Sequence, residues 1–201
     1  MVNIIKFLKE VADGSEPYAF VESKARANAA ADVRRGVECL LATQIKVDGR
    51  RTVWCQQHDP ITLAPASARN YEMPSKSGAE SANIMLFLMD LPNPDSRVVA
   101  SVHAAADWFK KVQIRDMVWE NAGTDGRKLV AKPGSGPLWA RYYDLKTNRP
   151  IFGDRDKTIH DDVSEISKER RNGYSWFSAR PQKALDRYAV WSKEHPRTDS
   201  Q

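Results

Sequence analysis

The strongest fold signal in the sequence is a nearly unbroken apolar segment, residues 81–91, which Pro92 brings to an end. Its apolar residues predict a helix that is buried in a domain, because the segment is too short to span a membrane. A second helix is expected to start at Asp95 or Ser96, with one apolar face formed by Val98, Val102, Ala105, Phe109 and Val112. Since only a short Pro-Asn-Pro link separates the two segments, they should pack as an antiparallel pair, as in helical bundles and toroids.

Further helices are predicted on both sides of this pair. They share apolar residues at spacings of three and four, and cover residues 2–12, 23–44, 162–173 and 181–195. The segment 114–137 is rich in Gly and Pro and should form a loop or an irregular hairpin. The chain is therefore expected to be mainly α, with long irregular connections that hold its unusual residues.

Short extended segments are also indicated. Asp48-Gly49, flanked by residues that alternate in polarity, is typical of a two-residue β-hairpin, and alternation over 138–145 predicts a short strand. Ser77 and Glu80 have the spacing of a capping box at the start of the apolar helix.

Composition limits the class of protein. Hydrophobic residues make up 41% of the 201 residues, which favours a globular chain. The formal net charge of +5 indicates an affinity for polyanions, either nucleic acid or an acidic polysaccharide, and does not choose between them. The two cysteines, Cys39 and Cys55, have neither the spacing of a metal site nor that of a disulfide framework.

The densest group of functional side chains lies between residues 139 and 176. Arginines alternate there with aromatic residues: Arg141, Arg149, Arg155, Arg170 and Arg171 with Trp139, Tyr142, Tyr143, Tyr174 and Trp176. A guanidinium group pairs at two points with a carboxylate or phosphate, and an aromatic face stacks on a sugar or a base. This pattern fits an acidic sugar polymer or a single-stranded nucleic acid. It also fits arginines that only stabilise their own turns.

Metal-binding signals are weak in the sequence. The four histidines share no metal-ligand spacing, and His103 falls in an apolar-periodic helix, which favours packing. The Asp154/Asp156 and Asp161-Asp162 pairs lack the spacing of an EF-hand loop, and we expect them to cap helices and form turns.

Three long motifs resemble one known family. They are KVDGRRTVWCQQHDPITLAPASARNYEMPSKSGAES, PLWARYYDLKTNRPIFGDRDK and ERRNGYSWF, at 46–81, 137–157 and 169–177, and they are similar to the pectate lyases of polysaccharide lyase family ten. The resemblance covers roughly residues 1–195. It implies an incomplete (α/α) toroid with long coil segments, and calcium-dependent β-elimination on polygalacturonate, the backbone of pectin.

The resemblance also implies roles for particular residues. Arg69, in SARNYE, corresponds to the base that removes the C5 proton of a uronic acid, while Arg141, Arg155, Arg170 and Tyr174 correspond to substrate-binding residues. An arginine base must lose a proton that its intrinsic pKa above about 12 strongly retains. Neighbouring cations, which also stabilise the charge that develops on the substrate carboxylate, would favour that loss. We therefore expect Arg69 to be exposed and in coil, between Pro65 and Pro74.

One part of the family pattern is not found. The family's calcium-binding aspartates and first toroid helices precede the segment with which this chain starts. We therefore expect residues 1–195 to form a single, truncated catalytic domain, followed by a tail at 196–201. Scattered carboxylates such as Asp59, Asp154 and Asp156 should bind calcium weakly, because calcium needs six to eight gathered oxygens.

Several interpretations remain open at this stage. The first is a secreted pectate lyase, with the location implied only by the family. The second is an acidic-glycan binding fragment without catalysis, and the third is a single-stranded nucleic-acid binder. Because truncation would leave apolar faces of the first two helices without neighbours, a homo-oligomer is also expected.

Overall fold

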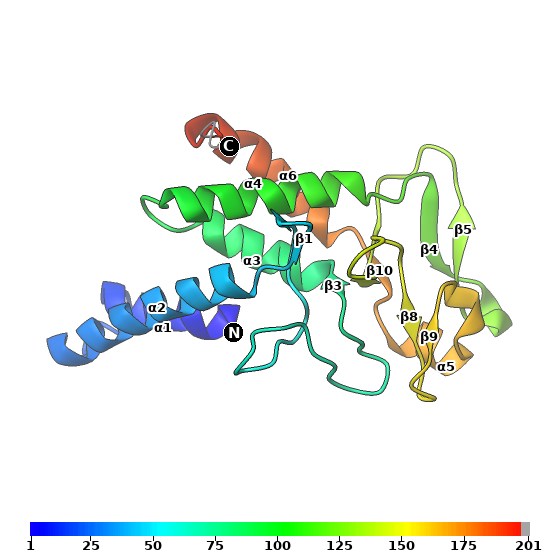
Figure 1. The fold of residues 1–201 in the computed structure, drawn as a ribbon, viewed down its shortest axis with the longest axis horizontal. Helices are drawn as coiled ribbons and strands as arrows, with labels where there is room; N and C mark the ends of the chain where they lie inside the picture. Colours follow the sequence, from blue (N-terminus) through cyan, green and yellow to red (C-terminus); the bar gives the residue numbers. More distant parts are fainter. Residues whose placement is uncertain (198–201) are drawn as a thin grey trace.

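The computed structural model describes residues 1–197 and is mainly helical (Figure 1). Its six α-helices are α1 (Val2–Asp13), α2 (Ser23–Thr43), α3 (Ala79–Met89), α4 (Ser96–Lys111), α5 (Lys168–Gly173) and α6 (Arg180–Glu194). The predicted mainly α class with long coil segments and short hairpins is confirmed. Over the described residues, no helix combines the length and the apolar character that a membrane crossing needs.

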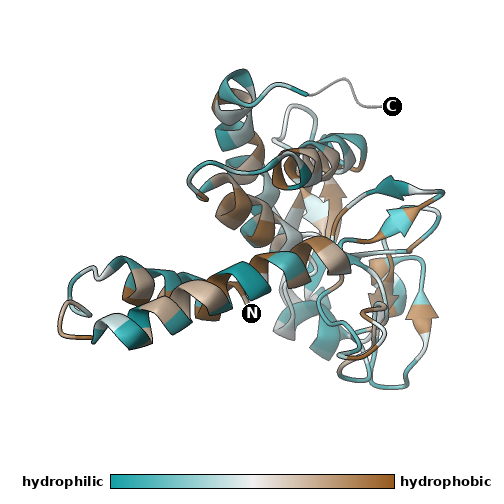
Figure 2. Cartoon of the chain, turned by 60° about the vertical axis from the view of Figure 1, so that its left-hand side comes forward, coloured by the Kyte–Doolittle hydropathy of each residue, from teal (hydrophilic) through white to brown (hydrophobic). Residues whose placement is uncertain are grey.

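Helices α1 and α2 form an antiparallel arm that projects from the rest of the chain (Figures 1 and 2). The two helices approach closely at Gly36, where an added Cβ would lie 2.8 Å from Cδ1 of Ile5. A side chain at position 36 would therefore displace Ile5, the buried residue of α1. Other apolar side chains of the arm stay exposed, among them Ile4, Phe7 and Phe20. The predicted self-association through such residues stays a prediction.

Helix α3 lies at the centre of the core, packed against both α4 and α6. Eight of its residues are buried, because its sequence is apolar on nearly all sides. Asp95 caps α4, and its carboxylate accepts hydrogen bonds from the amides of Arg97 and Val98 at 2.9 and 3.0 Å. The predicted antiparallel pair of helices is thus confirmed, together with its start signal.

The remaining regular structure consists of two-stranded antiparallel pairs and two 3-10 turns, η1 (Gly123–Asp125) and η2 (Val163–Glu165). The sequential hairpins pair β1 (Lys46–Val47) with β2 (Arg50–Arg51), β4 (Met117–Asn121) with β5 (Arg127–Ala131), and β8 (Phe152–Gly153) with β9 (Ile159–His160). The long-range pairs join β3 (Lys76–Ser77) to β7 (Tyr142–Tyr143), and β6 (Trp139–Ala140) to β10 (Phe177–Ser178). As predicted, Asp48 and Gly49 form the first turn, with φ of 50° and 76°.

Two local predictions need correction or completion. The predicted capping box is wrong, because Gly78 directly precedes α3. The hydroxyl of Ser77 donates to the carbonyl oxygen of Trp54, and Glu80 forms an ion pair with Arg141. The boundary proposed at residue 196 stays a prediction, and 198–201 lie outside the described residues. Arg197, inside the predicted tail, forms an ion pair with Asp107 at 2.6 Å.

Candidate active site

Arg69 lies in a bend of the long coil between β2 and β3, with its side chain 59% exposed. The turn around it is closed by Glu72, whose amide donates to the carbonyl oxygen of Arg69 at 2.9 Å. The amide of Ala68 in turn donates to the carbonyl oxygen of Glu72 at 3.0 Å. The expected exposure and coil conformation of Arg69 are confirmed.

Glu72 is a buried carboxylate, 3% exposed, at the centre of the site's hydrogen bonds. Its Oε1 accepts from the Arg69 guanidinium, from Nε2 of Gln56 at 3.1 Å and from the phenol of Tyr174 at 2.7 Å. Its Oε2 accepts from the amide of Arg69 at 3.2 Å. These donors, the Arg69 guanidinium first, lower the pKa of Glu72 to about 2. Glu72 therefore stays ionised and holds Arg69 in place.

The same ion pair opposes a role of Arg69 as a base, because it stabilises the protonated side chain. The hydrogen bond to Glu72 stabilises the guanidinium and raises the pKa of Arg69 above its ordinary value. Arg69 is therefore a stable cation in the free chain. It can act as a base only after it has lost a proton, and the pairing with Glu72 opposes that loss.

Two tyrosine rings gather three arginines around them. The rings of Tyr71 and Tyr174 meet edge to face with centroids 5.2 Å apart. Three guanidinium carbons lie near the centroid of the Tyr174 ring. Their distances from it are 5.8 Å for Arg69, 4.5 Å for Arg141 and 5.7 Å for Arg170. Cations at these distances interact favourably with an aromatic face. Arg69, Arg141, Arg170 and Tyr174, which we call the arginine cluster, thus come from three separate segments to one place.

Arg141 is positioned by a change of strand partner. β6 pairs with β10 and β7 pairs with β3, and Arg141 lies between them, its amide bonded to the carbonyl oxygen of Trp176 at 2.7 Å. Its carbonyl oxygen accepts from the amide of Gly78 at 2.9 Å. A Cβ at Gly78 would come within 2.4 Å of the carbonyl oxygen of Ala140, so this approach requires glycine. The single strand predicted over 138–145 is thus two strands, separated at Arg141.

The Arg141 side chain is fixed by neighbours on both sides. It is 18% exposed and donates to Oε1 of Glu80 at 2.7 Å and to the phenol of Tyr142 at 3.3 Å. The phenols of Tyr142 and Tyr174 are 2.7 Å apart, which links Arg141 to Glu72 through two hydroxyl groups. The two sides of the site therefore share one hydrogen-bonded network.

Arg155 and Arg170 meet at a second shared carboxylate. Arg155 is 67% exposed and pairs at two points with Glu169, at 2.8 and 3.0 Å. Arg170 donates to Glu169 at 3.2 Å but is only 5% exposed, with its Cζ 4.2 Å from the Tyr71 centroid. Arg155 is accordingly available to a ligand, whereas Arg170 contributes charge from a buried position. The structure brings Arg155 to the edge of the arginine cluster rather than into it.

The carboxylate partners were not foreseen from the sequence. Glu72, Glu80 and Glu169 each pair with a predicted site arginine. Glu72 follows Arg69 by three residues, a spacing that a turn brings together, whereas the spacing of Glu80 from Ser77 indicates a helix cap. Gln56 and Tyr71 gave no signal, since their roles depend on packing between distant segments.

The described residues do not fit a calcium site. Over residues 1–197, no three His, Cys, Asp or Glu side chains are grouped so as to hold a metal ion. The carboxylates considered as ligands accept other hydrogen bonds instead: Asp59 from Thr62, Asp156 from Thr158, and Asp154 from Arg155 and from Ser167 of a separate segment. Over residues 1–197 they are not gathered around one point, as calcium requires.

The helical fold of this chain is similar to that of solved polysaccharide lyases. The family model described as pectic acid lyase matches residues 1–185, and the chain belongs to that family. No relative was found among the curated proteins.

Two solved structures are similar over nearly the whole chain. The first is a family 10 polysaccharide lyase from Cellvibrio cellulosa, with a TM-score of 0.89, 30% identity, and coverage of 95% of this chain and 60% of that chain. The second is a variant of a family 10 polysaccharide lyase from the same organism in complex with trigalacturonic acid, with a TM-score of 0.87, 29% identity, and coverage of 97% and 60%. This chain therefore spans about 60% of the length of the structures it matches.

Proposed function

We propose that this protein is a secreted pectate lyase that cleaves polygalacturonate by β-elimination, with Arg69 as the base and residues 1–195 as part of the catalytic domain. The observation that carries the proposal is the arginine cluster, in a family with a relative whose structure contains trigalacturonic acid. Three cations around two tyrosines suit a chain that presents one carboxylate on each sugar.

The chemistry assigns different tasks to these arginines. Arg69, in its neutral form, removes the C5 proton of a uronate, and the electron pair forms the C4–C5 double bond. The C4–oxygen bond breaks, and the leaving oxygen takes up a proton from water. Arg141 and Arg155 bind carboxylates and stabilise the negative charge that develops at C5. Arg170 adds positive charge from beneath Tyr71, and Tyr174 holds the surrounding side chains in place.

The ion pair between Arg69 and Glu72 sets a condition on this mechanism. Glu72 keeps Arg69 protonated, so deprotonation requires that the pair be broken or offset by cations when substrate is bound. Calcium dependence belongs to the same proposal, but the described residues provide no group of ligands for the ion. No step is therefore assigned to calcium within this chain.

Kinetics of Arg69 variants on polygalacturonate test the proposal, with ultraviolet absorbance of the unsaturated product as the readout. Arg69→Lys and Arg69→Ala should lower kcat by about 10²-fold or more with little change in substrate affinity, because a base acts in the transition state. Arg149→Lys, an exposed arginine in the same segment as Arg141 and Arg155, serves as the matched control. Near-full turnover by Arg69→Lys would exclude the base role.

A second candidate is an acidic-glycan binding protein without catalysis. Two observations favour it: the stable cation at Arg69 and the lack of a metal-ligand group over residues 1–197. It predicts saturable binding of polygalacturonate with no product, with or without added calcium. Any calcium-stimulated product that disappears in Arg69→Ala would decide for the lyase.

A further inference from the structure

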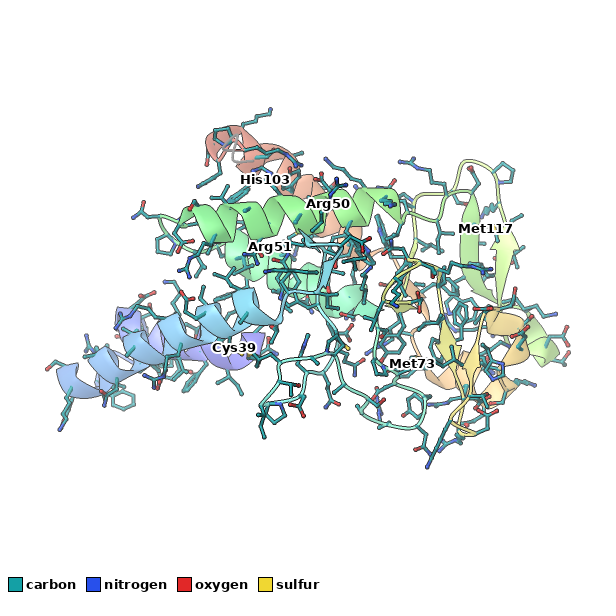
Figure 3. The ribbon with its side chains drawn as sticks, viewed as in Figure 1. Cys39, Arg50, Arg51, Met73, His103 and Met117 are labelled. Carbon is teal, nitrogen blue, oxygen red and sulfur yellow. The ribbon has the colours of Figure 1, made fainter. Side chains whose placement is uncertain are left out.

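A large cavity lies on a different part of the molecule from the arginine cluster. It has a volume of about 930 Å³ and is lined by the β1–β2 hairpin, by one face of α4 and by the loop around Asn148. Figure 3 shows Arg50 and Arg51 of the hairpin beside α4, which also carries His103. Its volume is at the upper end of the roughly 300–1,000 Å³ of ordinary ligand pockets. We call it the α4 groove, and its lining includes no residue of the arginine cluster.

The α4 groove concentrates the positive charge of the chain. Its lining contains six cationic side chains, namely Arg50, Arg51, Lys76, Lys111, Lys146 and Arg197, against the two carboxylates of Asp48 and Asp107. That excess of four compares with a net charge of +5 for the entire sequence. Concave surfaces of one sign focus the electrostatic potential and attract oppositely charged ligands.

Most of these cations have no carboxylate partner. Over residues 1–197, Arg50, Arg51, Lys111 and Lys146 form no ion pair, and of the lining cations Arg197 alone does, with Asp107. At the candidate active site, by contrast, Arg69, Arg141 and Arg155 are each bound to a glutamate. An anion entering the α4 groove would therefore meet free cations and would not have to displace carboxylates.

Lys76 adds a buried charge beneath the groove. It is 0% exposed, and its Nζ donates to Oδ1 of Asn148 at 2.7 Å, an oxygen that also accepts from Nε1 of Trp108 at 2.7 Å. Burial lowers the pKa of Lys76 to about 8. An anion in the groove would stabilise the charged form of this lysine, which is costly to bury alone.

The lining distinguishes between two kinds of polyanion. Single-stranded nucleic acid binds to aromatic faces on which bases stack. The aromatic rings in the lining, Trp108 and His103, are 4% and 5% exposed and offer no such face. An acidic sugar chain needs no stacking when its carboxylates meet separate cations.

We propose that the α4 groove is a second binding site for an acidic polysaccharide, which holds uronate carboxylates on Arg50, Arg51, Lys111 and Lys146. The groove and its charge stand independently of the arginine cluster, while the choice of polygalacturonate as the polymer rests on the proposed function. A site of this kind retains a long substrate on the protein while another part of the same polymer is free to occupy the arginine cluster.

Retardation in native gels containing polygalacturonate tests this site in the intact chain, with neutral dextran gels as the reference. Arg50→Gln/Arg51→Gln should weaken the apparent affinity about fivefold, since two pairs between a cation and a carboxylate are lost at the surface. Lys24→Gln/Arg34→Gln removes two exposed, unpaired cations from α2 and is the matched control. Circular dichroism melts of both double variants establish that the fold is retained.

The outcomes separate this site from the proposed active site. Loss in the groove variant but not in the control, with residual binding removed by adding Arg141→Gln/Arg155→Gln, supports two sites. Loss only in Arg141→Gln/Arg155→Gln overturns the groove and leaves the proposed function intact. Loss only in the groove variant supports the groove and contradicts substrate binding at the cluster. Equal weakening in groove and control variants, or a groove effect on an oligothymidine probe alone, overturns the proposal.

Discussion

The phenol of Tyr174 donates a 2.7 Å hydrogen bond to Oε1 of Glu72, the carboxylate that also binds the Arg69 guanidinium. The two residues are 102 positions apart in the sequence. Through this contact, the coil that contains Arg69 is attached to the segment that contains Arg170. The position of Arg69 thus depends on a buried carboxylate and on a distant tyrosine.

Replacement of Glu72 by Gln should change the acid stability of the protein. Because the folded-state pKa of about 2 is below the ordinary 4.5, the ionised Glu72 stabilises the fold above pH 4.5, and that stabilisation is lost as pH falls through about 2. Its full size is roughly 3 kcal/mol. Urea unfolding should show a larger drop in the free energy of unfolding from pH 6 to pH 3 for wild type than for Glu72→Gln. Glu120→Gln, at an exposed residue of β4, is the control. Parallel pH profiles for wild type and Glu72→Gln would contradict the assignment.

Arg141 and Arg155 should differ in their effect on folding. Arg155→Ala removes an exposed pair and should cost less than about 1 kcal/mol. Arg141→Ala leaves the partly buried Glu80 without its guanidinium and should cost about 2 kcal/mol in urea unfolding. Both variants should weaken polygalacturonate binding in native gels. Arg149→Ala should change neither stability nor binding. Equal stability losses for the two would mean that the burial of Arg141 has no energetic role.

Lys76→Met should stabilise the protein at neutral pH. The folded-state pKa of about 8 is below the ordinary 10.5, so between these values the unfolded chain binds more protons and wild-type stability rises with pH. We expect the free energy of unfolding of Lys76→Met to exceed that of wild type by up to roughly 3 kcal/mol at pH 7. The loss of the hydrogen bond to Asn148 reduces this gain. The difference should shrink as the pH of the unfolding experiment rises to 10.5. A difference independent of pH would show that the ammonium group is not responsible.

Calcium should have little effect on the isolated chain. Over residues 1–197 no three acidic, histidine or cysteine side chains are grouped, so carboxylate oxygens are not gathered to bind the ion tightly. Thermal unfolding with millimolar calcium or with a chelator should give melting temperatures within about 1 °C of each other. Asp154→Asn/Asp156→Asn should respond in the same way as wild type. Saturable micromolar binding in calorimetry would reveal a site that this structure does not suggest.

The sequence by itself determined the local structure of this protein. Apolar spacing and the Pro-Asn-Pro link predicted α3 and α4, Asp95 predicted the start of α4, and Asp48-Gly49 predicted the first hairpin. These signals are reliable because each acts over a few residues of backbone, through periodicity, capping or turn conformation. The long motifs indicated the family through their resemblance to it. The same resemblance indicated the arginines that lie in one region of the structure.

Only the tertiary structure decided what those arginines contact. Glu80 has the spacing of a cap, yet it pairs with Arg141, 61 residues away, because β7 and β3 bring the two segments together. Lys76 looks like an ordinary surface lysine in sequence, but packing against the core removes it from water and lowers its pKa. Partners and burial depend on which distant segments pack together to bury apolar surface, and no short stretch of sequence contains that information.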